Sequence, residues 1–213
     1  MASQLLGFII SKHGIMVDPF KVEEILQLSP PHKVNQLQSL QGKDNFLRRF
    51  IANYAEITKG FMRLLKKEVP FYWDERAQRH FEALKKALSS TPILSPPYYN
   101  KYFILYLAAL EYTLKMVLVQ EDESLQEHAI YYLSRSLVEV ELSYAHVEKL
   151  ALAVVHIAQR LRHHMVLRKT YVVACLNPFQ YILTHCMISW KFDKWIIILQ
   201  EFDLEFRLAK VNK

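Results

Sequence analysis

The chain of 213 residues is 52% hydrophobic and 13% aromatic, which excludes an intrinsically disordered protein and provides for one or two folded domains. Its formal net charge of +6 is mildly basic, a balance that fits a nucleic-acid partner without requiring one. The two cysteines, Cys175 and Cys186, stand in no CxxC or Cys/His series, so we expect neither a zinc site nor a disulfide framework.

Positive charge is concentrated in the first half of the chain. Residues 1–100 carry 14 Lys and Arg against 9 Asp and Glu, whereas residues 101–213 carry 13 against 12. We therefore expect a nucleic-acid contact surface to lie mostly in the first half. No apolar run is long enough to span a membrane, and the first residues lack a signal-peptide pattern. This predicts an intracellular protein, cytoplasmic or nuclear, that is not secreted and has no membrane partner.

The first residues predict a β-hairpin followed by a short helix. The apolar runs Leu5–Ile10 and Ile15–Val17 flank a four-residue turn that ends in Gly14. Asp18 is then expected to cap a helix, with Pro19 at its first position. Two prolines a few residues further on bring this helix to an end.

Helical periodicity then continues up to a proline-rich segment. One long helix is predicted over about residues 34–54, with Gly42 as a weak point or a bend. A shorter helix is predicted over residues 58–65, and Asp74 is expected to cap another. Three prolines in Thr91–Asn100 predict a linker, which is the best domain boundary in the chain.

Beyond residue 100 the pattern changes to strands and helices that alternate. Strands are predicted over residues 102–110, 113–120, 129–134, 171–175 and 203–208, and helices over residues 144–162, 178–183 and 191–200. This order predicts a mixed five-stranded sheet with helices packed on it. With the hairpin and helices of the first half, the whole chain is predicted to be a mixed α/β (α+β) protein.

Five motifs of the first half follow one another in order: Leu5–Phe8, Gly14–Val22, Leu37–Ile51, Leu64–Lys67 and Trp73–Lys85. They resemble the end of the palm and the thumb of reverse transcriptases from Ty3/gypsy-type (Metaviridae-like) retrotransposons. The resemblance implies that residues 1–90 form a primer-grip hairpin with a helical thumb/connection, and that Leu6, Gly7 and Phe8 belong to the primer grip. It places the polymerase aspartates upstream of Met1, so we expect that this chain alone cannot polymerise.

The second half has three replaced positions in otherwise familiar motifs. Tyr106–Leu110, Tyr144–Ala153 and Val172–Phe179 are similar to the Y-T-D-A-S, Y-S-x-x-E-K-E-L-L-A and V-Y-T-D-H-K-P-L patterns of the ribonuclease H domain in the same family. The resemblance implies that residues 91–100 are a linker and that residues 101–213 are an RNase H-like domain truncated at its C-terminus. Ala108, Leu150 and Cys175 stand where the family has metal-binding acids, and a fourth acid is expected beyond Lys213.

These replacements remove the oxygen ligands that the family's chemistry requires. Two-metal phosphodiester hydrolysis needs hard oxygen ligands that converge on ions about 4 Å apart. Alanine and leucine offer no ligand, and a thiolate is a poor ligand for Mg²⁺, the metal that the family uses. Glu148 is expected to point away on its helix, and Glu111 to lie on the other strand face or in a turn. We therefore expect no intact catalytic residue, no metal and no other cofactor, and a domain that folds without divalent ions.

Six basic residues are candidates for nucleic-acid binding: Arg48, Arg49, Lys66, Lys67, Arg168 and Lys169. The first four belong to the thumb-like region, which in the family cradles a hybrid duplex, and contacts of this kind position a backbone without reading its sequence. The alternative for these four is a solvated helix face. The last two, with Arg160 and Arg162, flank the end of a long helix, where they contact phosphate or simply complement the helix dipole.

The remaining candidates have ordinary structural interpretations. His156, His163 and His164 are predicted to be surface or helix-end histidines, because no acid converges with them on a metal. Cys175 is predicted to be a small buried hydrophobic residue and not a nucleophile, because no histidine or basic residue is adjacent to it in the sequence. Trp190 and Trp195 are predicted to be core or rim aromatics around the last helix.

Three functions are open at this point. The preferred one is a catalytically inactive, retrotransposon-derived reverse transcriptase/RNase H-like fragment that binds an RNA–DNA hybrid or another nucleic-acid backbone. The second is an active ribonuclease H-type endonuclease of a retroelement polyprotein. The third is an inert or protein-interaction remnant. Cleavage of a labelled hybrid separates the second from the others, and the salt dependence of duplex binding separates the first from the third.

Overall fold

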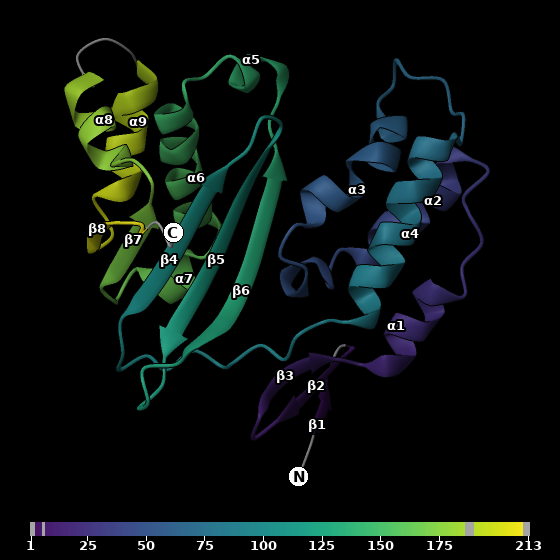
Figure 1. Cartoon of the computed structure of the whole chain (residues 1–213), viewed down its shortest axis with the longest axis horizontal. Coiled ribbons are helices and arrows are strands. Elements are labelled where there is room, and N and C mark those ends of the chain that lie inside the picture. Colours follow the sequence, from purple (N-terminus) through teal and green to yellow (C-terminus); the bar gives the residue numbers. More distant parts are fainter. Residues whose placement is uncertain (1–2, 6, 186–189, 211–213) are drawn as a thin grey trace. The chain divides into compact units, whose positions relative to one another are not determined.

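The computed structural model of the chain describes residues 3–5, 7–185 and 190–210. These residues form two compact units (Figure 1). The first unit runs to Pro96 and includes Tyr132–Ser134, and the second unit runs from Pro97 onward without those three residues. Within the described ranges, no helix is both long and apolar enough to cross a membrane.

An antiparallel sheet of three short strands opens the first unit: β1 (Ser3–Leu5), β2 (Phe8–Ser11) and β3 (Gly14–Val17), in the order β1-β2-β3. The predicted hairpin is present, but Ser11 pairs with Gly14, so its turn is shorter than the predicted four residues. The run expected as one strand is interrupted at Gly7, whose φ of 84° lies in the left-handed region that favours glycine. The chain reverses there and adds β1 to the sheet.

Both helix caps that the sequence predicts in the first unit are confirmed. α1 (Pro19–Leu26) is capped by Asp18, whose side chain accepts a backbone hydrogen bond at 3.0 Å. α4 (Glu75–Ser89) is capped by Asp74, whose side chain accepts a backbone hydrogen bond at 2.8 Å. An aspartate in this place satisfies an N–H group of the first turn that has no partner within the helix. These boundaries are therefore set by local sequence.

The prediction of a single helix over residues 34–54 is wrong, because this segment forms two helices with a 3₁₀ turn between them. α2 (Val34–Asp44) is followed by the 3₁₀ turn η1 (Arg48–Phe50), and α3 (Tyr54–Met62) begins only afterwards. Tyr54 Oη donates a hydrogen bond to the buried Asp44 carboxylate at 2.8 Å, which ties the end of α2 to the start of α3. The apolar positions of the pattern are nevertheless all buried: Leu37, Leu40, Leu47, Phe50, Ile51 and Tyr54.

α3 and α4 pack closely against each other in the first unit. The 3₁₀ turn η2 (Arg63–Leu65) continues α3, so the helix predicted over residues 58–65 is present but begins earlier. Gly60 lies at the contact, where an added Cβ would lie 2.1 Å from the His80 ring. The absence of a side chain at this position therefore sets how closely the two helices approach.

The segment predicted as a linker contacts the first sheet. Leu94 is fully buried, and its backbone N–H and C=O bond with Ile15 at 2.8 and 2.7 Å. The change from the first unit to the second follows at Pro96. The assignments of residues 1–90 to palm and thumb, and of residues 91–100 to a linker, remain predictions.

The second unit contains the predicted mixed sheet of five strands: β4 (Phe103–Ala109), β5 (Thr113–Glu121), β6 (Glu127–Ser136), β7 (Thr170–Ala174) and β8 (Leu204–Leu208). Their order across the sheet is β6-β5-β4-β7-β8. β4 and β5 are antiparallel, whereas β7 runs parallel to both β4 and β8. The strands were expected in these places, because alternation of apolar residues and the turn residues between them are local signals.

Helices flank this sheet: α5 (Glu139–Leu142), α6 (His146–Arg160), α7 (Arg162–Met165), α8 (Pro178–His185) and α9 (Trp190–Leu199). α6 packs on β4 and β5, and α8 and α9 pack on α6, so all three lie on one side of the sheet (Figure 1). Ala151 and Val155 of α6 form a core cluster with Ile182, Phe192 and Trp195. The short helix α5 was not predicted.

Candidate functional site

Two of the three positions that lack an acid come together at one end of the five-stranded sheet. β4 and β7 are parallel, with Tyr106 level with Val173. Continued past this pair, the register places Ala108 level with Cys175. Both residues are exposed. Parallel strands that end at the same edge present the residues at their carboxyl ends to a common site.

The third position lies on α6, whose first turn reaches the same edge. His146, the first residue of α6, places Nε2 3.4 Å from the Sγ atom of Cys175. Leu150 lies about one helical turn further along that face of α6 and is fully buried. Ala108 and Cys175 are therefore open to solvent, whereas Leu150 belongs to the core.

The prediction that Cys175 is a small buried hydrophobic residue is wrong. The alternating residues Thr170, Val172 and Ala174 of β7 are buried, and Cys175 follows the end of the strand, where it is exposed. His146 is distant from it in the sequence, and only the packing of α6 against the sheet brings the two side chains together. Adjacency in the sequence could not reveal this pair.

Neither nearby acid replaces the missing carboxylates. The Glu148 carboxylate forms an ion pair with Lys191 of α9. Burial lowers the pKa of Lys191, but the hydrogen bond and charge of Glu148 outweigh burial and leave this pKa above its ordinary value. Glu111 lies in the turn between β4 and β5, and its carbonyl oxygen accepts a hydrogen bond from Lys149 Nζ at 3.3 Å.

The donor set at this edge does not fit a divalent metal of the Mg²⁺ type. Such an ion needs several oxygen ligands, and the positions in question supply a methyl group, a buried isobutyl group and a thiol. Across the residues that the structure describes, no group of three or more His, Cys, Asp or Glu side chains is arranged to hold a metal ion.

The two arginines of the thumb-like region are half-buried. The guanidinium of Arg49 lies 5.7 Å from the centre of the Phe50 ring and 5.9 Å from that of Phe8, distances typical of cation–π contacts. Arg48 lies near enough to Asp44 for its charge to oppose the rise in pKa that burial causes there. Both arginines therefore have structural contacts, besides their candidate role with nucleic acid.

The four other basic candidates are exposed at two separate places. Lys66 and Lys67 follow η2 in the first unit. Arg168 and Lys169 precede β7 in the second unit. Lys169 Nζ lies 2.6 Å from a carboxylate oxygen of Glu205, and this hydrogen bond raises the pKa of Lys169. Lys169 therefore stays protonated, and the carboxylate of Glu205 offsets part of its positive charge.

The arginines around the end of α6 have different environments. Arg160 is exposed on α6, whereas Arg162 Nε lies 2.7 Å from a carboxylate oxygen of Glu201. His164 Nδ1 lies 3.0 Å from Tyr99 Oη, and its ring centre lies 4.0 Å from that of His163. These contacts agree with ordinary surface histidines near a helix end.

The residues assigned to the primer grip are mainly packing residues in this structure. Leu6 lies outside the described residues. Gly7 supplies the left-handed turn before β2, and its carbonyl oxygen accepts a hydrogen bond from Asp18 N at 3.0 Å. The Phe8 ring lies 5.7 Å from the rings of both Phe46 and Phe50. Phe8 therefore fixes the sheet to the segment that follows α2.

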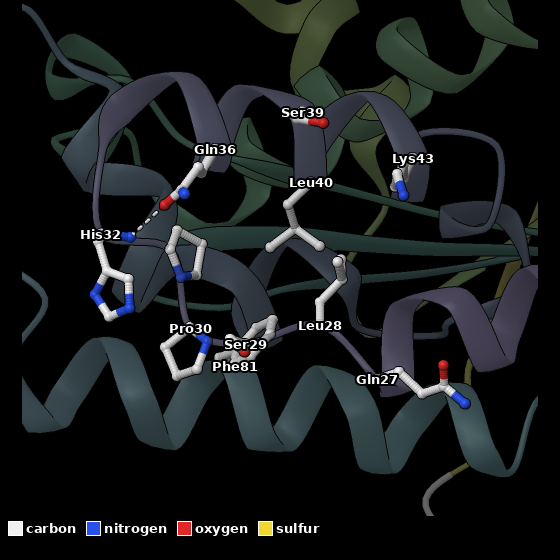
Figure 2. Close-up of a pocket in the computed structure, with 11 residues that line it drawn as sticks. Gln27, Leu28, Ser29, Pro30, His32, Gln36, Ser39, Leu40, Lys43 and Phe81 are labelled. Atoms are coloured by element: carbon white, nitrogen blue, oxygen red, sulfur yellow. Dashed lines mark hydrogen bonds between the residues drawn. The ribbon is translucent and has the colours of Figure 1, made fainter.

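A cavity of about 410 Å³ in the first unit was not predicted (Figure 2). It lies between the end of α1, the two prolines that follow it, and α2. In Figure 2 the side chains of Leu28 and Leu40 point toward each other across it, while Gln36 accepts a hydrogen bond from His32 N at 2.7 Å. No sequence motif marks it, because its walls come from segments brought together by folding: Gln27, Leu28, Ser29, Pro30, Pro31, His32, Gln36, Ser39, Leu40, Lys43 and Phe81.

Comparison with known protein families matches the middle of the chain, from α4 to β7, to one family. Residues 73–172 match the family of RNase H-like domains found in reverse transcriptase. Residues 73–172 are therefore similar to an RNase H-like domain of the reverse-transcriptase kind, the resemblance that the motifs indicate.

The relatives of the chain are transposon polyproteins of the Ty3/gypsy type. The retrovirus-related Pol polyprotein from transposon opus of Drosophila melanogaster is 31% identical over 95% of this chain and 21% of its own length. The corresponding protein from transposon 297 is 29% identical over 98% of this chain and 19% of its own length. The Tf2-3 polyprotein of Schizosaccharomyces pombe is 24% identical over 95% of this chain and 16% of its own length. The chain spans about a fifth or less of these relatives.

Solved structures of a viral reverse transcriptase have the same fold. The foamy viral protease-reverse transcriptase in complex with RNA/DNA hybrid has a TM-score of 0.84 and is 22% identical, covering 100% of this chain and 30% of that one. A variant in complex with double-stranded DNA also has a TM-score of 0.84, at 20% identity, covering 100% of this chain and 38% of that one. At this level of identity the similarity establishes the fold alone.

Proposed function

We propose that the chain is a retroelement-derived reverse transcriptase/RNase H-like segment that binds the backbone of an RNA–DNA hybrid or a related duplex without cleaving it. The observation that carries this proposal is the end of the sheet to which the parallel register of β4 and β7 leads, where Ala108 and Cys175 stand in place of acids. An RNase H-like domain is present, yet no cluster of carboxylates converges at this edge among the described residues.

Chemistry supports the absence of cleavage. Hydrolysis of a phosphodiester by the two-metal route requires ligands that hold both ions and stabilise the attacking and leaving oxygens. Glu148, the acid closest in sequence to the third position, is engaged by Lys191. A thiol at Cys175 prefers softer metals than Mg²⁺.

Charge and exposure support the binding part of the proposal. The chain has a formal net charge of +6, and Lys66 and Lys67 are exposed side by side in the first unit. Lysines of this kind bind phosphates as point charges and release counterions, which gives affinity without sequence preference. The relatives with this fold include proteins solved with a hybrid and with duplex DNA.

The proposal is tested by titrating a labelled RNA–DNA hybrid with the wild-type chain at several salt concentrations. We expect the apparent affinity to fall steeply with salt. Each phosphate contact that is lost should reduce the slope of log K against log salt by about 0.9. The double variant Lys66→Gln/Lys67→Gln should therefore lower the slope by up to about 2.

A matched control removes the same charge elsewhere. Lys86 and Lys194 are exposed lysines outside the candidate set, and the double variant Lys86→Gln/Lys194→Gln should leave the slope unchanged. If both double variants lowered the slope equally, binding would depend only on the net charge of the chain and not on the position of Lys66 and Lys67. Absence of salt-sensitive binding by the wild-type chain would favour the inert or protein-interaction remnant instead.

A further inference from the structure

An exposed thiol and an exposed imidazole face each other where β7 ends and α6 begins. Sγ of Cys175 lies 3.4 Å from Nε2 of His146, within the distance of a hydrogen bond to sulfur. Both side chains are exposed, so a reagent in solution can reach them. A nucleophile within hydrogen-bond reach of a base is the arrangement that activates a thiol.

The imidazole of this pair belongs to the first turn of a helix. His146 is the first residue of the 15-residue helix α6, and Ala145 before it offers no side-chain cap. The positive end of the α6 dipole therefore lies at the residue whose side chain contacts the thiol.

The other charged groups at the start of α6 have partners of their own. Glu148 forms an ion pair with Lys191 of α9. Lys149 donates a hydrogen bond to the carbonyl oxygen of Glu111 in the turn after β4. From β5, Lys115 lies level with Ala108 at the same end of the sheet. Glu148 is thus paired with a lysine, and both Lys149 and Lys115 carry positive charge.

We propose that Cys175 and His146 form a reactive thiol–imidazole pair, and that Cys175 is a site of thiol–disulfide exchange with small disulfides of the glutathione type. This site is independent of nucleic-acid binding. The thiol proton passes to Nε2 of His146, and the thiolate attacks one sulfur of the disulfide. A bond forms between Sγ and that sulfur while the original S–S bond breaks. The leaving thiolate takes up the proton, so Cys175 is oxidised and the departing sulfur is reduced.

The reaction is measured on the full chain carrying Cys186→Ser, which leaves Cys175 as its only cysteine. The probe is glutathione disulfide, and the product is the mixed disulfide detected by mass spectrometry after acid quenching. At about pH 7 we expect this chain to react at least about fivefold faster than the same chain with His146→Gln. The variant His164→Gln, which changes a histidine elsewhere in the unit, should keep the faster rate.

A second pH separates activation by His146 from a change in access. At about pH 10 a cysteine ionises without help, so the rates with and without His146→Gln should agree within about twofold. Circular dichroism confirms that each variant is folded. Equal rates at about pH 7 would overturn the proposal. It would also be overturned by a difference that persists at about pH 10, because His146 would then act by shape alone.

Discussion

Asp44 is a carboxylic acid in a fully buried position at the end of α2. Burial raises the pKa of Asp44 to about 7, while the hydrogen bond from Tyr54 and the charge of Arg48 lower it to a smaller extent. Oδ1 of Asp44 has no hydrogen-bond partner among the residues that the structure describes. The protonated acid is therefore the form that this site accommodates best.

This residue makes the stability of the first unit depend on pH. The pKa of Asp44 is higher in the folded chain than in the unfolded chain, so its contribution is fully present below about pH 4 and is lost as the pH rises through about 7. Between about pH 5 and pH 8 the wild-type chain should lose about 2–3 kcal/mol more stability than Asp44→Asn. Urea unfolding at both pH values measures this.

The exposed Asp193 provides a control for that measurement. Asp193→Asn should have the same pH dependence as the wild-type chain. Identical slopes for the wild-type chain and Asp44→Asn would show that the buried acid does not titrate in this range.

The three replaced positions also differ in what they tolerate. Ala108 and Cys175 are exposed, so an aspartate at either position stays hydrated. Leu150 is fully buried, so Leu150→Glu forces a carboxylate into an apolar core or expels the helix face from it. We expect Leu150→Glu to destabilise the chain by more than about 3 kcal/mol, and Ala108→Asp by less than about 1 kcal/mol.

Thermal unfolding followed by circular dichroism measures both variants against the wild-type chain. A melt for Leu150→Glu that matches the wild-type melt would mean that the α6 core can open to solvent at this position. Refilling the family's acid positions is therefore limited by the core as well as by ligand number.

At the scale of elements, the contact between α3 and α4 depends on one glycine. An added Cβ on Gly60 would lie 2.1 Å from the His80 ring and 3.0 Å from the Arg76 carbonyl oxygen. Gly42 in α2 has no atom within 4 Å of its added Cβ. Substitution of Gly60 therefore tests close packing between helices, whereas substitution of Gly42 tests helix propensity alone.

Substitution by alanine should change stability in opposite directions at these two positions. Gly60→Ala is expected to destabilise the chain by about 2 kcal/mol or more, because the helices must move apart. Gly42→Ala is expected to stabilise it by up to about 1 kcal/mol, because alanine favours helix and meets no obstacle. Denaturant unfolding of the pair provides the comparison, and destabilisation by both substitutions would contradict the close contact at Gly60.

The elements that could be predicted are those with local signals. Asp18 and Asp74 cap their helices as expected, because an N-cap acts within one turn. The division of the segment over residues 34–54 into two helices could not be predicted. Its apolar residues keep a helical spacing across the break, so the pattern does not mark where the first helix ends. In the fold, a hydrogen bond between Asp44 and Tyr54 joins the end of α2 to the start of α3.

The site was predicted less completely than the fold. The motif comparison singled out Ala108, Leu150 and Cys175 before their positions in space were known. His146 and the exposure of Cys175 were missed, since both depend on how α6 meets the sheet. Lys85 shows the same limit: the motif marks it, but its hydrogen bonds to the Leu26 and Leu28 carbonyl oxygens appear only in the fold.

At the scale of the whole molecule, the fold does not depend on the acidic residues that cleavage of a nucleic acid would require. Residues 73–172 match the RNase H-like domain found in reverse transcriptase, and the chain spans about a fifth or less of its transposon relatives. Its sheet order and buried core do not depend on carboxylates, because apolar burial and strand pairing hold them together. Residues other than acids at positions 108, 150 and 175 are therefore compatible with an intact scaffold, and an intact scaffold is not evidence of cleavage.

Cleavage of the RNA strand of a labelled RNA–DNA hybrid by the purified wild-type chain, in Mg²⁺ and separately in Mn²⁺, tests this separation of fold from cleavage most directly. We predict no cleavage above that of buffer alone, at protein concentrations where the hybrid is bound. Cleavage that co-purifies with the chain and stops when the metal is chelated would contradict it, and would mean that other groups hold the ions.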